Sequence, residues 1–356
     1  MKRRKFLKSL GGSIALTSLL TDNISASIRK PEYKWKMVTS WPKNFPGLGA
    51  GAENLAKLIT NLSGNRINIK VFGANELVPP LEVFDFVSNG GAELGHSGAY
   101  YWKGKSQACQ FFSSVPFGMN AQEMNAWLYY GDGIALWEKL YKSFNLIPRP
   151  AGNTGVQMGG WFNKKITTID DLKGLKMRIP GLGGEVLARA GGVPVTMAGS
   201  ELFTALQTGV IDATEWVGPY NDRAFGLHKA ANYYYFPGWH EPGPSIECII
   251  NRGKYNSLPE DLKLIIDTAC KAINIDMLSD YTSKNNMALQ FLKKENIEIL
   301  KFPNDVLIKL KDISNTILKE ISESDEITKE VYESYMSFKD NVSPWTEISE
   351  KAYLNI

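Results

Sequence analysis

The chain of 356 residues has few of the side chains that build sulfur-rich or soft-metal centres. It contains three cysteines, Cys109, Cys248 and Cys270, which lie far apart and form no C-x-x-C pair, and only three histidines. This scarcity argues against a disulfide scaffold, an iron–sulfur site and a zinc ribbon. At most one disulfide bridge can form, between any two of the three thiols, with one thiol left over.

The chain also lacks a long apolar run after its amino terminus and a strong charge of either sign. It is 44% hydrophobic and 22% charged, as is usual for a protein with an ordinary core. Of its 40 basic and 37 acidic side chains, five and one lie in residues 1–26, which leaves 35 basic and 36 acidic. The net charge without that segment is therefore −1, and charge offers no case for nucleic-acid binding.

The amino terminus, MKRRKFLKSLGGSIALTSLL, begins with basic residues and continues into a short apolar run. The run is too short to span a bilayer and is typical of a secretory signal. The R-R-x-F-L-K pattern starting at Arg3 indicates twin-arginine export, although Lys2 departs from that pattern. An ordinary Sec signal and an uncleaved anchor remain the alternatives. We expect residues 1–26 to be an export signal peptide cleaved near Ala26.

Strand-like and helix-like patterns alternate through most of the chain, which predicts an α/β fold with parallel sheets and helices on their faces. From Pro259 the pattern is wholly helical, and Pro259-Glu260 is a good helix start. Thr168 opens a one-turn helix of the capping-box type. The expected strands are 33–41, 66–72, 92–96, 146–153, 156–163, 175–179, 194–197, 213–217 and 245–251; the expected helices are 52–62, 80–88, 120–141, 184–190, 200–208, 259–292, 304–320 and 327–339, with a loop at 233–244.

About 330 residues after the signal are too many for one simple core and predict two lobes. No internal repeat or low-complexity linker separates them, so the lobes should interleave along the chain. We expect lobe I at 33–154 plus 245–260 and lobe II at 155–244. Residues 259–356 should form a long helix and helical tail that pack on both lobes or on a dimer partner.

Two strand ends carry the most informative side chains. Arg178 ends the strand in DLKGLKMRIPG (Asp171–Gly181), and Glu215-Trp216 end another in ELFTALQTGVIDATEWVGP (Glu201–Pro219). A guanidinium is a rigid fork of donors that fits a carboxylate in two contacts. Beside a strand-end carboxylate, it indicates a site for a small organic acid together with a cationic group.

These two segments resemble those of the substrate-binding subunits of tripartite ATP-independent periplasmic (TRAP) transporters, and most of all those of the 2-oxo acid and lactate receptors. Three further segments carry the resemblance: Phe72–Trp102, Val156–Lys164 and Phe236–Glu247. Together the five segments are spread through residues 33–252. The resemblance implies a two-lobed, type II-like periplasmic binding fold that closes hinge-wise on its ligand. It also implies a periplasmic location, a membrane permease as partner and a homodimer through the long carboxy-terminal helix.

The resemblance assigns roles to individual residues. Arg178 should hold the carboxylate of a 2-oxo or 2-hydroxy acid such as pyruvate or lactate. A sodium or calcium ion should bridge protein and ligand, held by Gln157, Glu215, the Trp216 carbonyl and Glu241. Such an all-oxygen set suits a hard cation, and acid and cation affinities should then be coupled. The expected substrate-binding residues are Arg178, Gln157, Trp216, Tyr100, Tyr101 and Asn153.

Each of these residues also has an ordinary structural interpretation. Arg178 could pair with a surface carboxylate such as Asp171. Glu215 and Glu241 could be solvated loop charges, Gln157 could satisfy a backbone group, and the tyrosines could simply pack. We interpret His96, His228 and His240 as structural, because their spacing fits no metal site.

Catalysis has little support in the sequence, because it contains no G-x-S-x-G, no H-E-x-x-H and no P-loop motif. Two carboxylates can serve as acid and base in a glycosidase, so a secreted carboxylate-dependent hydrolase is the alternative from another class. Twin-arginine signals often precede redox enzymes, but the scarcity of cysteine and histidine argues against one. A receptor of the same family for a different organic acid is the remaining alternative.

Overall fold

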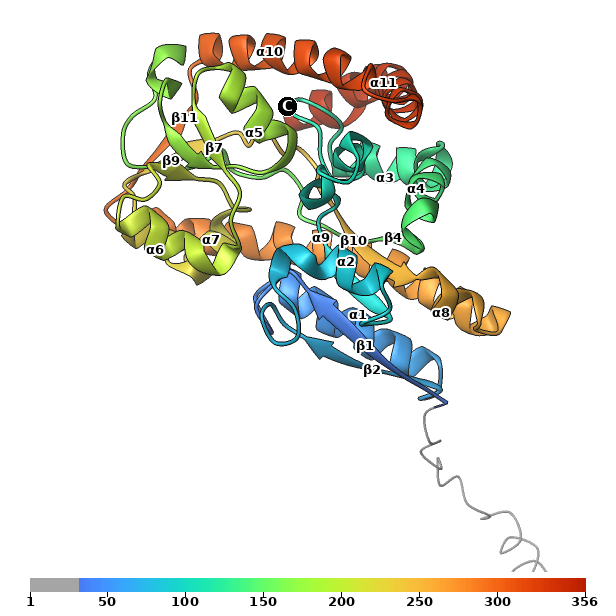
Figure 1. The fold of residues 1–356 in the computed structure, drawn as a ribbon. Coiled ribbons are helices and arrows are strands. Elements are labelled where there is room, and N and C mark those ends of the chain that lie inside the picture. Colours follow the sequence, from blue (N-terminus) through green and yellow to red (C-terminus); the bar gives the residue numbers. More distant parts are fainter. Residues whose placement is uncertain (1–31) are drawn as a thin grey trace, which may run out of the picture.

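The computed structural model describes residues 32–356, and the predicted export signal at 1–26 lies outside the described residues. The described chain forms two separate β-sheets with helices packed around both (Figure 1). The predicted α/β class, with two sheets and a long carboxy-terminal helix, is confirmed. In the described part of the chain, no helix combines the length and apolar character needed to cross a membrane.

The first sheet has the strand order β2-β1-β3-β10-β4. Strands β1, β2 and β3 are parallel, as predicted, but β10 runs antiparallel to both β3 and β4. The predicted parallel arrangement is thus confirmed for β1, β2 and β3, whereas β10 enters this sheet antiparallel on the return of the chain from the second one. The bounds are β1 (Tyr33–Thr39), β2 (Ile67–Phe72), β3 (Leu94–Ser97), β4 (Leu146–Asn153) and β10 (Ser245–Asn251).

The second sheet has the order β11-β9-β5-β8-β6-β7, and its strands are short. The pairs β6–β7, β6–β8 and β9–β11 are parallel, whereas β5 is antiparallel to β8 and β9. Strand β9 lies in the predicted loop at 233–244, and β11 lies in the tail predicted as wholly helical, so both predictions were wrong. The bounds are β5 (Gly160–Phe162), β6 (Lys176–Arg178), β7 (Val193–Val195), β8 (Ala213–Thr214), β9 (Tyr233–Phe236) and β11 (Glu298–Lys301).

Several helices differ from their predicted bounds. The predicted helix 120–141 is two helices, because the chain is extended at Gly131, where a Cβ atom would lie 2.8 Å from the Trp127 carbonyl oxygen. Helix α1 starts at Leu48, before the predicted start at 52, and α7 was not predicted. The helices near the first sheet are α1 (Leu48–Leu62), η1 (Pro80–Glu82), α2 (Val83–Ser88), η2 (Ala99–Trp102), η3 (Gln107–Phe112), α3 (Ala121–Tyr130), α4 (Gly133–Tyr141), η4 (Lys142–Phe144) and α8 (Arg252–Asn256).

The remaining helices surround the second sheet or form the carboxy-terminal region. The capping box at Thr168 is confirmed, since its side chain and that of Asp171 each accept a bond from the other's backbone. The bounds are η5 (Ile169–Leu172), α5 (Gly181–Arg189), η6 (Gly199–Glu201), α6 (Leu202–Gln207), α7 (Pro219–Phe225), η7 (Leu227–Lys229), α9 (Glu260–Leu292), α10 (Asn304–Ser322), α11 (Glu326–Thr346), η8 (Glu347–Lys351) and α12 (Ala352–Leu354).

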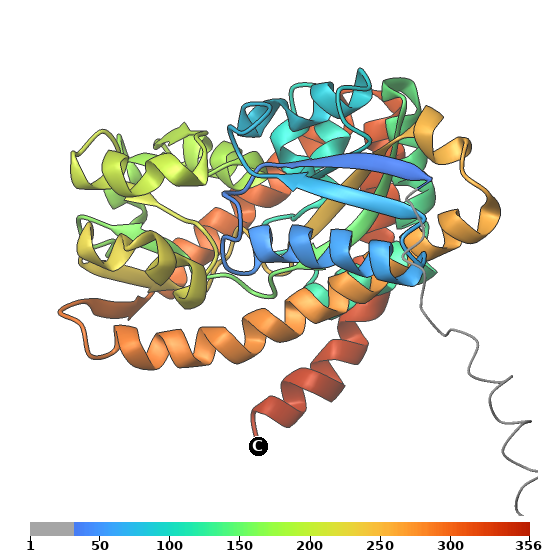
Figure 2. The ribbon, with the colours of Figure 1, turned by 90° about the horizontal axis from the view of Figure 1, so that it is seen from below.

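Helix α9 runs along both parts of the molecule (Figure 2). It packs against β4 and α1 beside the first sheet and against α7 beside the second. Its apolar stripe, from Leu262 through Ile266 and Ile273 to Met277, is buried within the same chain. The stripe is therefore core, and the helix braces the two sheets against each other.

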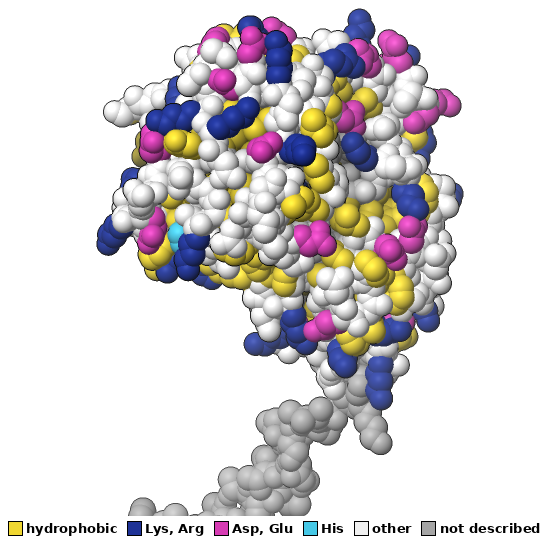
Figure 3. All heavy atoms as spheres, turned by 60° about the vertical axis from the view of Figure 1, so that its left-hand side comes forward, with side chains coloured by type: hydrophobic (Ala, Val, Ile, Leu, Met, Phe, Trp, Pro, Cys, Tyr) yellow, Lys and Arg dark blue, Asp and Glu magenta, His cyan; other side chains and the backbone are white. Residues whose placement is uncertain are grey.

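Strand membership follows the expected interleaving. The first sheet draws its strands from within 33–154 and 245–260, and the second from within 155–244, with β11 added from the tail. The lobe boundaries themselves stay predictions. On the face shown in Figure 3, basic and acidic side chains are interspersed, as the near-neutral charge leads one to expect.

Candidate cation and carboxylate site

The sheet brings the two informative strand ends together. Strands β6 and β8 are parallel neighbours, and Arg178 is in register with Thr214, the residue before Glu215. The two strands therefore end at the same edge. There the Arg178 guanidinium donates through Nη1 to Glu215 Oε1, and both side chains are only 1% exposed.

Arg178 also reaches the first sheet. Its Nη2 donates to the hydroxyl of Tyr101 (3.1 Å), which lies in η2, directly after β3. Its Nε donates to the Met197 carbonyl (3.3 Å), and the guanidinium lies 4.9 Å from the ring centroid of Trp216. Burial lowers the pKa of Arg178, but the charges of Glu215, the two tyrosines and Glu241 together raise it, so the side chain stays charged. This arginine thus links the two sheets at one buried point.

Glu241 and Gln157 lie on two loops that pair beside this point. The Gln157 backbone N–H donates to the Glu241 carbonyl (3.1 Å), and the Gln157 carbonyl accepts from Gly238 (2.8 Å). Burial, and then the charge of Glu215, raise the pKa of Glu241 well above its usual range, although Arg178 opposes this. The site therefore holds two buried carboxyl groups against one guanidinium.

Three buried oxygens in this cluster have no hydrogen-bond partner among the described residues: Gln157 Oε1, Glu215 Oε2 and Glu241 Oε2. Buried polar atoms are nearly always bonded, so a group of unpaired acceptors calls for a ligand. One potential metal-ligand atom from each of Glu215, His240 and Glu241 lies within 4.8 Å of the other two. The observation fits a hard cation such as sodium or calcium, which binds carboxylate and amide oxygens.

His240 also lies in this cluster, although its spacing led us to expect a structural role, and that role stays a prediction. Its Nε2 lies 3.5 Å from Glu215 Oε2, and neither ring nitrogen has a partner among the described residues. Its position directly before Glu241 could have indicated that it lies in the cluster, whereas the spacing of the three histidines could not. Because imidazole is not among the usual ligands of sodium or calcium, its free N–H is better suited to donate to an acid.

The remaining histidines and cysteines lie in ordinary packing positions. His96 accepts from Trp41 Nε1 (2.9 Å), and burial lowers its pKa to about 4. His228 lies beside the ring of Phe291, outside the cluster. The three cysteines are buried and free.

The three other predicted contact residues, Tyr100, Trp216 and Asn153, differ in how their polar groups are used. Tyr100 packs edge-on against Tyr101 (4.6 Å between ring centroids) and close to Gly181, the first residue of α5. Trp216 is buried, with its Nε1 unpaired. Asn153, in contrast, has both ends of its amide occupied, since Oδ1 accepts from Gly155 N–H and Nδ2 donates to the Gly243 carbonyl.

Two simpler interpretations do not hold. Asp171 is not the partner of Arg178, because its carboxylate accepts from Thr167 and Thr168 within its own turn. Glu215 and Glu241 are not solvated loop charges, being 1% and 4% exposed.

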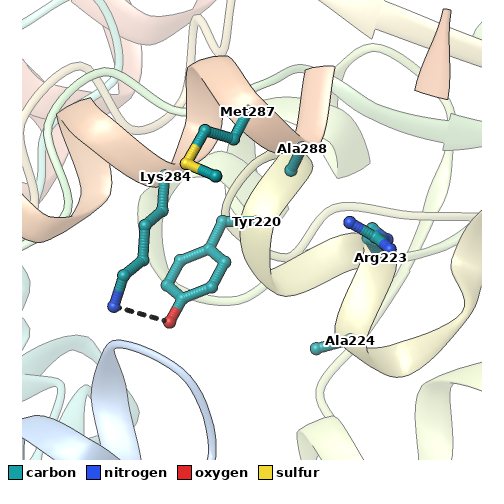
Figure 4. Close-up of a pocket in the computed structure, with 6 residues that line it drawn as sticks. All are labelled: Tyr220, Arg223, Ala224, Lys284, Met287 and Ala288. Atoms are coloured by element: carbon teal, nitrogen blue, oxygen red, sulfur yellow. Dashed lines mark hydrogen bonds between the residues drawn. The ribbon is translucent and has the colours of Figure 1, made fainter. Parts of the chain in front are cut away.

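A separate hollow of about 410 Å³ lies on the surface between α7 and α9 (Figure 4). Lys284 donates there to the hydroxyl of Tyr220 (3.3 Å). No residue of the predicted site lines it; its lining residues are Tyr220, Arg223, Ala224, Lys284, Met287 and Ala288.

Comparison with known proteins places this chain in a family. Residues 37–325 match the bacterial extracellular solute-binding proteins, family 7. The chain is 43% identical to a monocarboxylate 2-oxoacid-binding periplasmic protein of Nostoc sp. (strain PCC 7120), over all of this chain and 98% of that protein.

Two solved structures are similar over 92% of this chain and 99% of their own. A TRAP periplasmic solute-binding protein from Pseudoalteromonas atlantica T6c, with bound sodium and pyruvate, has 42% identity and a TM-score of 0.89. Another, from Colwellia psychrerythraea with bound calcium and pyruvate, has 43% identity and a TM-score of 0.89. The chain belongs to the family 7 extracellular solute-binding proteins, the periplasmic receptors of TRAP transporters.

Proposed function

We propose that this receptor captures a small monocarboxylic 2-oxo or 2-hydroxy acid together with a sodium or calcium ion, and delivers the acid to a TRAP permease. The three unpaired buried oxygens beside the Arg178–Glu215 ion pair carry this proposal. The relatives that bind pyruvate with sodium or calcium support it.

Each residue of the cluster has one role. Arg178 binds the carboxylate of the acid, since its fork of donors suits two oxygens. Glu215, Glu241, the Gln157 amide oxygen and the Trp216 carbonyl hold the cation, which when bound supplies positive charge to an oxygen of the ligand. Tyr100 and Tyr101 face the ligand from the first sheet, and the Asn153 amide holds the crossing segments.

Coupling between acid and cation follows from the charges. Arg178 and Glu215 neutralise each other when neither ligand is bound. If Arg178 turned to a carboxylate ligand without a cation, the charges of Glu215 and Glu241 would remain buried and uncompensated, at a cost of several kcal/mol. The two ligands should therefore strengthen each other's binding.

Lobe I at 33–154 plus 245–260 and lobe II at 155–244 would close on the ligand about the segments where the chain crosses between the two sheets. Asn153 pairs those segments by binding both Gly155 and Gly243. The bond between Tyr101 and Arg178 joins the two sheets across the site and supports such a closure.

A receptor fits the cluster better than a hydrolase does. Glycosidases separate their two carboxyl groups by about 5 Å or more to flank the bond they break. Here Arg178 is bound to Glu215, and ligand atoms of Glu215 and Glu241 lie close enough together for one cation to bind both carboxylates. We infer that the chain binds its ligand and releases it unchanged.

We also propose how the chain is exported and how it assembles. Residues 1–26 would direct export to the periplasm and be removed near Ala26. A homodimer is supported by the exposed apolar side chains at the end of the chain, which extends away from the rest of the molecule (Figure 2). These side chains are Trp345, Ile348, Tyr353, Leu354 and Ile356. Light scattering of the full chain and of a chain ending at Pro344 would test the dimer: the full chain should be dimeric and the shortened one monomeric.

Calorimetry with matched acids tests the function. Pyruvate and lactate carry an oxygen beside the carboxylate, whereas propionate has the same length without it. We expect stoichiometric binding of at least one oxygen-bearing acid in the presence of sodium or calcium, and much weaker binding of propionate. Equal affinity for all three acids would contradict the proposed role of the cation, and conversion of any of them would contradict the receptor role.

A further inference from the structure

A third buried carboxylate lies in β10, outside the cluster. Glu247 ends the Phe236–Glu247 segment that carries part of the family resemblance, and none of the roles above uses it. It is fully buried and lies in the middle of the first sheet, in register with Ser97 of β3 and Pro150 of β4. A carboxylate in this position is costly unless its oxygens are bonded.

Two side chains from different elements bind the two oxygens of Glu247. Trp102 Nε1 donates to Oε1, and the Tyr141 hydroxyl donates to Oε2 (2.9 Å). The rings of Trp102 and Tyr141 both pack on Phe84, each at 5.3 Å between centroids. Glu247 therefore fixes the direction of the Trp102 indole and does not merely fill space beneath it.

Trp102 is the last residue of η2, the single 3₁₀ turn that also carries Tyr100 and Tyr101. The turn is short and its backbone is tied, since Tyr101 N–H donates to Gly98 and Lys103 N–H to Tyr100. A shift of the indole would therefore move the neighbouring tyrosines with it. The Tyr101 hydroxyl is the group that accepts from Arg178 across the site.

We propose that Glu247 is a positioning residue for ligand capture: by holding Trp102 from within the first sheet, it places Tyr100 and Tyr101 against Arg178. The inference rests on the proposed function, because it assigns η2 to the ligand site. It adds a residue that contacts neither acid nor cation and acts only through η2.

Two substitutions remove the link in different ways. Glu247→Gln keeps the shape but turns an amide N–H toward one of the two donors, and Trp102→Phe keeps an aromatic ring but removes its N–H. Ile266→Ala is the matched control, because it removes a fully buried side chain from a separate core cluster that contains neither Glu247 nor any residue of η2. We expect all three to lower the melting temperature, and only the first two to weaken pyruvate binding, by roughly tenfold.

A double-mutant cycle separates positioning from general damage. If Glu247 acts through Tyr101, then Glu247→Gln should weaken binding much less in a Tyr101→Phe background than in the wild type. Fully additive losses, or unchanged affinity in Glu247→Gln, would overturn the inference.

Hydrogen exchange without ligand gives a second readout that does not depend on the identity of the acid. The amides of residues 98–103 should exchange faster in Glu247→Gln and Trp102→Phe than in the wild type, and remain unchanged in Ile266→Ala. Equal exchange in all four proteins would overturn the inference. If the wild type bound no oxo acid, the proposed function would fail, while exchange at 98–103 would still decide whether Glu247 places η2.

Discussion

Asp222 and the Glu215–Glu241 pair are buried to the same degree, yet their surroundings differ completely. Asp222 accepts four hydrogen bonds: from Trp161 Nε1 (3.0 Å), the Tyr234 hydroxyl (2.7 Å) and two backbone N–H groups, those of Val217 (3.2 Å) and Gly218 (3.1 Å). Glu215 and Glu241 each keep one oxygen with no partner among the described residues.

The difference separates a structural carboxylate from a binding one. Asp222 holds the turn that follows Glu215-Trp216, and its bonds offset part of the cost of burial, although burial still raises its pKa to about 6. The unpaired oxygens of Glu215 and Glu241 leave part of that cost in place until a cation binds. Burial alone therefore does not identify a site, whereas burial without donors does.

Arg178→Ala should have the largest effect, because it removes the acid anchor and leaves Glu215 buried without its partner. Loss of the charge-assisted contact should weaken acid binding by about 1.5–3 kcal/mol, roughly 10- to 150-fold, or more. Breaking the buried pair should also lower the free energy of unfolding by about 3–5 kcal/mol. Calorimetry and denaturant unfolding would measure the two effects. Unchanged affinity in a folded variant would remove Arg178 from the site.

Asp222→Asn should mainly reduce stability. The new amide N–H groups would face donors that now have an acceptor, at a cost of about 1–3 kcal/mol in the free energy of unfolding. Asn in place of the exposed Asp170 is the matched control and should change stability by no more than about 0.5 kcal/mol. If Asp222→Asn weakened acid binding more than Arg178→Ala did, Asp222 could not be distinguished as a structural carboxylate from the binding pair Glu215–Glu241.

Glu241→Gln should raise the stability of the ligand-free protein, whereas Asp222→Asn should lower it. Replacing a buried carboxyl group that has too few hydrogen-bond donors should raise the free energy of unfolding of the ligand-free protein, by about 1 kcal/mol. The same change should weaken cation-dependent acid binding, because one of the oxygens that hold the cation loses its charge. Thermal unfolding with and without ligand would test both signs. A destabilised ligand-free variant would show that Glu241 is satisfied in the way that Asp222 is.

The smallest effect concerns pH. Burial raises the pKa of Glu247 from 4.5 to about 7, although Trp102 and Tyr141 oppose this. Between these values the folded protein holds a proton that the unfolded chain has lost, so its free energy of unfolding falls as pH rises through the window. Glu247→Gln should remove this contribution, and denaturant unfolding across the window should then show a shallower decline than in the wild type. An identical pH dependence in both proteins would contradict the assignment.

Local sequence patterns predicted strands at 175–179 and 213–217, and the structure has Arg178 at the end of β6 and Glu215 directly after β8. The two side chains meet because β6 and β8 are neighbouring strands. Local patterns did not predict that these strands are neighbours, and only the family resemblance implied it. The sequence could also have excluded Asp171 as the partner of Arg178, since the predicted capping box at Thr168 already uses that carboxylate.

What the sequence concealed depends on long-range pairing. Strands β9 and β11 have only four residues each and exist because they pair with each other, although one lies in a predicted loop and the other among helices. The break at Gly131 depends on the close approach of the Trp127 carbonyl. The approach of His240 to Glu215 could not be predicted, because the two residues lie on separate segments and histidine spacing does not encode their contact.

The affinity for pyruvate as a function of sodium or calcium concentration, at constant ionic strength, tests the central claim most directly. If the unpaired oxygens of Gln157, Glu215 and Glu241 hold a cation that bridges to the acid, pyruvate affinity should rise steeply with the concentration of the sodium or calcium ion that binds there. It should fall to a low limit when an organic cation replaces that ion. Pyruvate affinity that is the same with and without either metal ion would contradict the account.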